Sequence, residues 1–223
     1  MSATTPTGTP PVSLRVMELS DVPVAVHLHR TNLPTGFFVE LGDRFLSRYY
    51  RTFLTSPAAV ALVAEVEGRA VGFLVGSTDE AVHHRHVIDL SRWDLARAGV
   101  TALLFRPELT ARFMRTRARR YLKGIRRAPE RATTSQEGPR GTVRAGVLSH
   151  IVVDSTLRRG GVGAVLVKGF ASIARVHGVK RLSLYTSHDN HAAQRFYQRL
   201  GWQSHPWQTD IDGKSWTPFT LDL

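Results

Sequence analysis

Cysteine is absent from this chain of 223 residues. Its absence excludes disulfide bonds, thiolate metal ligands and a cysteine nucleophile that carries an acyl group. Lysine is scarce, because only Lys123, Lys168, Lys180 and Lys214 stand among the 30 basic residues. No apolar run approaches the roughly 18 residues that make a membrane-spanning helix. We therefore expect a protein of the reducing cytoplasm.

The length bounds the organisation of the chain. A chain of 223 residues can bury one substantial core but is too short for two domains of average size. Residues 1–12 are rich in threonine and proline and lack the basic start and apolar middle of a signal peptide, so we expect a disordered tail. Residues 13–223 are predicted to form a single domain.

The most informative segment runs from Val147 to Gly163. Its first residues are mostly aliphatic or β-branched and predict a buried strand that ends at Asp154. A loop containing Gly160, Gly161 and Gly163 follows, and helical spacing of apolar residues then continues to about His177. Glycines in front of a helix allow several backbone amides to converge on one anion, and the helix dipole adds to the attraction. The segment therefore predicts a binding site for a phosphate or diphosphate.

Two motifs carry a family resemblance. The first is Arg-x-x-Gly-x-Gly, filled by Arg158, Gly161 and Gly163, and the second is NHAAQRFYQRLGW over residues 190–202. With a strand predicted between them at Arg181–Thr186, the chain resembles the GNAT superfamily of N-acetyltransferases, which take an acetyl group from acetyl-coenzyme A. The resemblance is close from Val147 to Trp202.

The resemblance implies a set of residues that bind the donor. The strand lends backbone hydrogen bonds to the pantetheine arm, the amides of the loop hold the diphosphate, and the second motif contributes further contacts. These residues are Ile151, Val152, Val153, Arg158, Arg159, Gly160, Gly161, Val162, Gly163, Ala164, Asn190, Phe196 and Tyr197. Acetyl-coenzyme A is thus expected as the acyl donor, and no metal is expected.

The resemblance also implies the chemistry. Tyr197 matches the tyrosine that protonates the departing thiolate, and a phenol of pKa about 10 remains protonated at neutral pH for that purpose. Many relatives carry an acid on the strand before the cofactor bulge, but this chain has Ser149 there, with His150 beside it. His150 can accept the amine proton directly or through water if its side chain faces the acceptor. At this position the chain therefore departs from the family pattern.

The first part of the chain predicts the acceptor side. Helices are expected at about Pro23–Arg30 and Asp43–Leu54, joined by an apolar loop. In the family this loop lines the acceptor pocket, so Phe37, Phe38 and Glu40 are candidate substrate contacts, although core packing would also explain both phenylalanines. Strands at Val60–Val66 and Arg69–Gly76 flank Glu67-Gly68, which is typical of a hairpin turn.

These elements predict the fold class. We expect an α/β protein with the GNAT-like acyltransferase fold: a central, mostly antiparallel, twisted sheet with helices on both faces. The expected activity is transfer of the acetyl group to the primary amine of a small molecule, directly and without an acyl-enzyme. A module that binds coenzyme A but has lost transfer remains an alternative, because the acidic base is missing.

A basic helical insertion is predicted at about residues 83–145. Fifteen Lys/Arg lie between Arg85 and Arg144 against five acids, so nearly all the excess positive charge of the chain lies there. Three alternatives stay open: a helix with a solvated arginine face, contact with an acidic acyl-carrier protein or an anionic membrane surface, and help with the phosphates of coenzyme A. Specific nucleic-acid binding is not expected, since no recognition motif accompanies the charge. His83, His84 and His86 are interpreted as exposed loop residues without a metal.

Overall fold

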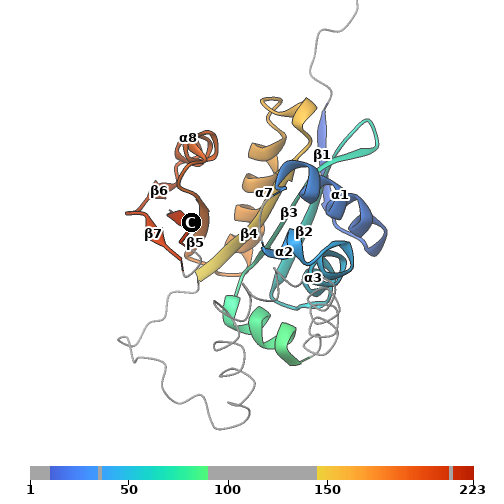
Figure 1. Ribbon diagram of the computed structural model, residues 1–223, viewed down its shortest axis with the longest axis horizontal. Helices are drawn as coiled ribbons and strands as arrows, with labels where there is room; N and C mark the ends of the chain where they lie inside the picture. The colour runs from blue at the N-terminus through green and yellow to red at the C-terminus, as the bar shows by residue number, and fades with distance from the viewer. Residues whose placement is uncertain (1–10, 35–36, 90–144, 211–212) are drawn as a thin grey trace, which may run out of the picture.

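A computed structural model describes residues 11–34, 37–89, 145–210 and 213–223. Its strands join in one mixed sheet in the order β1-β2-β3-β4-β5-β8-β6, with β7 paired to β8 (Figure 1). The strands are β1 (Val12–Val16), β2 (Ala59–Val66), β3 (Arg69–Ser77), β4 (Ala145–Val153), β5 (Arg181–Ser187), β6 (Gln203–Ser204), β7 (Gln208–Thr209) and β8 (Ser215–Asp222). The helices are α1 (Val22–Asn32), α2 (Phe37–Glu40), α3 (Asp43–Thr55), α7 (Val162–Val176) and α8 (His191–Arg199), with short 3-10 turns η1 (Leu19–Asp21) and η2 (Ser155–Leu157).

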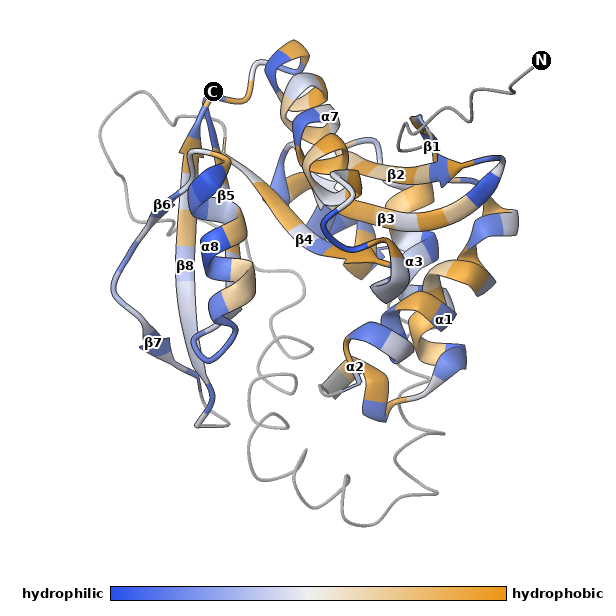
Figure 2. Cartoon of the chain, turned by 90° about the horizontal axis from the view of Figure 1, so that it is seen from above, coloured by the Kyte–Doolittle hydropathy of each residue, from blue (hydrophilic) through white to orange (hydrophobic). Residues whose placement is uncertain are grey.

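Helices cover both faces of the sheet, as the sequence predicts. In Figure 2, α7 lies on one face of the strands and α1 and α3 lie on the other. The core is accordingly divided into two clusters: one gathers α7 and the C-terminal strands around Leu166, Phe170 and Phe219. The second packs α1 and α3 on the sheet through Leu46, Tyr50 and other buried residues. β2, β3 and β4 supply both clusters because successive side chains of a strand point to opposite faces.

The N-terminal strands form an antiparallel meander, with β1 paired to β2 and β2 to β3. The predicted hairpin is confirmed: Glu67 and Gly68 connect β2 and β3 and both have positive φ, at 52° and 74°. Two consecutive left-handed residues make the turn whose twist suits a two-residue hairpin. The glycine has no Cβ to oppose this conformation, which fixes the position of the turn and with it the register of the strands.

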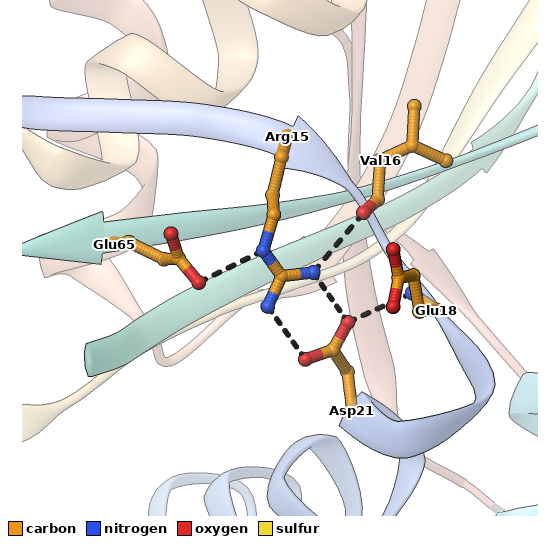
Figure 3. Close-up of polar contacts among 5 residues, drawn as sticks. All are labelled: Arg15, Val16, Glu18, Asp21 and Glu65. Carbon is orange, nitrogen blue, oxygen red and sulfur yellow. Dashed lines mark hydrogen bonds and ion pairs between the residues drawn. The ribbon is translucent and has the colours of Figure 1, made fainter. Parts of the chain in front are cut away.

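A network of charged groups fastens β1 to its neighbours (Figure 3). The guanidinium of Arg15 donates to both carboxylate oxygens of Asp21, at 2.6 and 2.8 Å, and to Glu65 of β2 at 2.8 Å. Asp21 also accepts from the backbone N–H of Glu18 at 2.7 Å, which caps η1. The hydrogen bond from Arg15 lowers the pKa of Asp21, and burial opposes that effect. The network joins β1, β2 and the start of α1.

β4 has two different neighbours. It pairs with β3 antiparallel along most of its length, but it pairs with β5 in parallel only from Ala145 to Val147. β5 instead remains paired with β8 along its whole length, from Arg181 to Ser187. Beyond Val147, the edge of β4 toward β5 therefore has no strand partner among the described residues, and the two arms of the sheet separate (Figure 2).

The structure corrects two local predictions. Residues 80–89 are helical, so His83, His84 and His86 lie on a helix and not in an exposed loop. His83 and His86 are half-buried because this helix packs against α3, where the ring of His83 lies 4.5 Å from that of Phe53. The apolar segment before Asp43, expected as a loop, contains the four-residue helix α2. Most of the predicted basic insertion, residues 90–144, and the predicted tail up to residue 10 lie outside the described residues.

Candidate active site

The connection from β4 to α7 has the conformation of an anion-binding loop. Asp154 ends the strand and accepts hydrogen bonds from the backbone N–H and the hydroxyl of Thr156. The chain then enters the left-handed region at Arg159 (φ 72°) and Gly161 (φ 81°). Gly161 is the N-cap of α7 and provides no side-chain hydrogen bond to the first turn. The first amides of this 15-residue helix consequently have no partner within their own helix and can receive an anion.

The second motif lies against this loop. A Cβ added at Gly163 would stand 3.2 Å from the ring of Phe196 and 3.8 Å from a methyl group of Val153. Phe196 of α8 thus packs directly on the first turn of α7, which needs a glycine at the contact. This contact brings Gly163 and Phe196 together at the end of β4, although more than thirty positions separate them in the sequence.

The structure places Asn190 and Tyr197 at the two ends of α8. The side-chain oxygen of Asn190 caps the helix by accepting from the N–H of Ala193 at 3.0 Å. Tyr197 is buried, and its ring contacts those of Phe196, Trp202 and Phe219. Burial raises the pKa of Tyr197, so the phenol stays protonated at neutral pH.

Arg158 joins the loop to the acceptor side. Its guanidinium donates to the side-chain oxygen of Asn32, the last residue of α1, at 2.6 Å. Both groups are close to the surface, and Arg158 itself is exposed. The loop after β4 and the end of α1 therefore face each other although 126 positions separate them in sequence.

A bulge in β4 decides where His150 points. Val75 of β3 pairs with His150, whereas the next residue, Gly76, pairs with Leu148, so Ser149 is an extra residue without a partner. Without the bulge, alternation would place His150 on the same face as Leu148, which belongs to the α7 cluster. The extra residue moves His150 to the face of Val75 and Val152, which is covered by α1 and α3.

On that face, His150 meets four other rings. We call His29, Phe38, Tyr49, Tyr50 and His150 the ring cluster. The ring centroid of His150 lies 5.2 Å from that of His29, 5.6 Å from Tyr49, 6.2 Å from Tyr50 and 6.5 Å from Phe38. His29 and Tyr50 are buried, and their side chains form a hydrogen bond between Nδ1 and the hydroxyl. Phe38, Tyr49 and His150 are half-buried and form the outer side of the cluster.

The ring cluster is a poor environment for charge. Burial lowers the pKa of His150 to about 3, and the nearby His29 adds to the effect. Burial also lowers the pKa of His29 to about 4. The pKa values of Tyr49 and Tyr50 are raised by the same cause. Both histidines and both tyrosines are thus neutral around pH 7.

The three predicted acceptor residues lie on α2. Phe38 stacks on Tyr49 at a centroid distance of 4.8 Å and so belongs to the cluster. Glu40 ends α2 and is half-buried, whereas the side chain of Phe37 lies outside the described residues. The sequence interpretation missed His29. The apolar stripe of α1 could have revealed it, because His29 follows Val22 and Val26 at helical spacing and so lies on the buried face of the helix.

The described part of the chain contains neither a metal-binding cluster nor a membrane-spanning helix. No group of three or more His, Asp or Glu side chains there could hold a metal ion. Among the same residues, no helix is both long and apolar enough to cross a bilayer.

Comparison with known proteins relates one segment of the chain to a known family. The model of the acetyltransferase (GNAT) family matches residues 129–202, while no curated protein sequence matches. Among solved structures, Ard1 from Thermoplasma volcanium aligns with a TM-score of 0.58 and 16% identity, covering 95% of this chain and 97% of that one. The ribosomal-protein-S18-alanine N-acetyltransferase from Escherichia coli gives 0.56 and 13%, covering 95% and 94%. A GNAT-family acetyltransferase from Streptococcus pneumoniae gives 0.55 and 17%, covering 96% and 99%.

At these identities the solved structures establish the fold, and the sequence match covers the segment that contains the glycine loop, α7, β5 and α8. Residues 129–202 therefore match the GNAT acetyltransferase family, and the chain has the fold of solved acetyltransferases, which together support an acyltransferase.

Proposed function

We propose that the protein transfers an acetyl group from acetyl-coenzyme A to the primary amine of a small molecule. The observation that carries the proposal is the end of β4, where a strand edge without a partner leads into a glycine loop and an uncapped helix. An edge of this kind offers N–H and C=O groups to an extended amide chain, and the loop offers N–H groups to a diphosphate. In coenzyme A, the pantetheine arm is such an amide chain, and the diphosphate is the anion that the loop would bind.

That arrangement supports the following assignment of donor-binding residues. Ile151, Val152 and Val153 would bind the pantetheine arm through their backbone, while the loop from Arg158 to Ala164 would hold the diphosphate. The positive charges of Arg158 and Arg159 suit the same anion. Asn190, Phe196 and Tyr197 of the second motif would complete the site from the α8 side.

The chemistry is a direct transfer. The amine nitrogen attacks the thioester carbonyl carbon, a C–N bond forms, and the C–S bond breaks as coenzyme A thiolate leaves. The nitrogen loses one proton and the thiolate gains one, so the overall reaction consumes none. Tyr197 would supply the proton to the sulfur, since its buried phenol is protonated at neutral pH.

The fate of the amine proton sets the role proposed for His150. The bulge turns this side chain toward α1 and α3, on the face where α2 also lies, and its neutral imidazole has a free nitrogen lone pair for a proton. With a pKa of about 3, however, it cannot hold a proton taken from a free alkylammonium ion. It would act only after attack, when the nitrogen is bonded to the acyl carbon and is far more acidic, and would pass the proton on to water. The hydroxyl of Ser149 is too weak a base to accept this proton, so Ser149 would contribute only a hydrogen bond to the reacting groups.

Acetyl-coenzyme A binding tests the donor site, and α7 offers a matched control. Gly161 and Gly178 flank the helix, have φ values of 81° and 73°, and have no atom within 4 Å of an added Cβ. Aspartate tolerates this conformation better than most residues. We expect Gly161→Asp to weaken acetyl-coenzyme A binding at least about tenfold in calorimetry, because a carboxylate beside the diphosphate repels it. Gly178→Asp should bind normally. Equal affinity for both variants, or no binding by the natural chain, refutes the donor site.

The basic segment favours one further candidate, a donor or acceptor held on an acidic carrier protein or at an anionic surface. Its support is the charge count between Arg85 and Arg144, since residues 90–144 lie outside the described part. Changing Arg115, Arg117, Arg119 and Arg120 to glutamate should abolish binding to carrier protein or anionic liposomes. Unchanged binding, or none by the natural chain, removes this candidate.

A further inference from the structure

The ring cluster restricts which amines the proposed transferase can use. Its outer side consists of Phe38, Tyr49 and His150, and it lies on the face of the sheet where His150 follows the β4 bulge. The next residues, Ile151–Val153, form the strand edge proposed to bind the donor arm. An amine that approaches the thioester from the side of α1–α3 therefore meets these rings.

Nothing among the described groups around the cluster neutralises a cation. His29 is already hydrogen-bonded to Tyr50, and both histidines are held neutral mainly by burial, with no carboxylate of the described segments contributing to either. On the surrounding helices, Arg30 and Asp43 form an ion pair with each other at 2.6 Å. Arg48 on α3 is itself positive, and Glu40 on α2 already interacts with another group.

Magnitudes favour an uncharged ligand in these surroundings. Bringing an ammonium ion into such a site without an ionic partner costs several kcal/mol of hydration free energy. Cation–π attraction to the aromatic rings returns only about 0.5–2 kcal/mol. In addition, a nucleophilic amine of pKa about 10.4 requires roughly 4.6 kcal/mol to lose its proton at pH 7. An amine that is already neutral at pH 7 incurs neither cost.

We propose that the acceptor is a weakly basic amine carried on a flat apolar body, such as an aromatic amine, bound in its uncharged form against Phe38, Tyr49 and His150. Stacking on Phe38 and Tyr49 binds the body, and the reacting nitrogen lies toward His150. This inference rests on the proposed acetyl transfer and adds the chemical class of the acceptor.

Two isomeric amines test the inference with the full chain. 4-Methylaniline and benzylamine have the same molecular formula, but only benzylamine is mostly protonated at pH 7. With saturating acetyl-coenzyme A, we expect kcat/KM for 4-methylaniline to be constant between about pH 6.5 and 8.5. For benzylamine it should be lower at pH 7 and rise about tenfold per pH unit, because only the neutral fraction binds. Release of thiol and the mass of the product report each reaction.

A pair of variants makes the test independent of the intrinsic reactivity of the two amines. Phe38→Glu supplies the missing anion and should change the preference at least about tenfold toward benzylamine at pH 7. Phe38→Leu keeps an apolar side chain and should leave the ratio of the two kcat/KM values nearly unchanged. Thermal melting establishes that each variant is folded. If Phe38→Glu is not folded, Tyr49→Glu introduces the anion in its place.

The outcomes separate this inference from the function on which it rests. If acetyl-coenzyme A does not bind in calorimetry, the proposed acetyl transfer fails first. Three results obtained with bound acetyl-coenzyme A would show that the uncharged-acceptor inference is wrong while the donor site stands. These are a preference for benzylamine at pH 7, a benzylamine rate that does not depend on pH, and acetylation of neither isomer.

Discussion

The Arg15 network should make a large and pH-dependent contribution to stability. The side chain of Asp21 is 10% exposed and that of Arg15 37%, and two hydrogen bonds of 2.6 and 2.8 Å join them. Replacing Asp21 by asparagine keeps the shape of the side chain but removes its charge. Loss of one partner of a well-buried pair costs about 3–5 kcal/mol, but Arg15 is partly solvated and keeps Glu65. We therefore expect Asp21→Asn to lower the free energy of unfolding by about 2–3 kcal/mol.

An exposed pair provides the control. Arg181 and Asp222 approach equally closely, at 2.6 Å, but their side chains are 54% and 64% exposed. Solvent screens such a pair, so Asp222→Asn should leave stability unchanged within the error of the measurement. Urea denaturation followed by tryptophan fluorescence measures both variants. For a chain of this size, the Asp21→Asn change should lower Tm by about 5–10 °C.

The pH dependence has a definite sign. The folded state lowers the pKa of Asp21, so its contribution is fully present above the unfolded pKa of about 3.9 and is lost as pH falls through the lower, folded pKa. The natural chain and Asp21→Asn should consequently differ at pH 7 and converge in strong acid. A stability difference below about 0.5 kcal/mol at pH 7, or one that persists unchanged in acid, would refute the argument.

The remaining predictions concern Tyr197 and Tyr50. Tyr197→Phe should reduce turnover in the thiol-release assay while the Kd for acetyl-coenzyme A changes less than about twofold, since only the proton donor is lost; unchanged turnover would show that the phenol has no chemical role. Tyr50→Phe leaves Nδ1 of the buried His29 without its partner, so it should destabilise the fold by about 1–3 kcal/mol in urea denaturation. A Tyr50→Phe variant as stable as the natural chain would contradict the importance of that hydrogen bond.

The sequence predicted those elements that local chemistry determines. The Glu67-Gly68 turn and the glycine before α7 each follow from the conformations that these residues prefer, and the structure contains both. The helix of residues 80–89 was missed, because a polar run with three histidines has little apolar periodicity.

The candidate site was predicted less completely, since its geometry depends on pairing between distant segments. The bulge at Ser149 exists only relative to β3, where Gly76 lets the strands come close: a Cβ there would lie 2.5 Å from the carbonyl oxygen of Val147. No local pattern reveals such an extra residue, so the face on which His150 lies could not be read from alternation. The position of His29 beside it likewise depends on how α1 crosses the sheet.

The pairing of β3 with β4 has a consequence for the evolution of the chain. Ser77 and Val147 stand opposite each other in adjacent strands although about seventy positions separate them along the backbone. The entropy of closing a connection grows only logarithmically with its length, by about 0.6 kcal/mol for each doubling. The junction can thus accept or lose long stretches of polypeptide at little thermodynamic cost. New recognition properties can be acquired there while the transferase core remains unchanged.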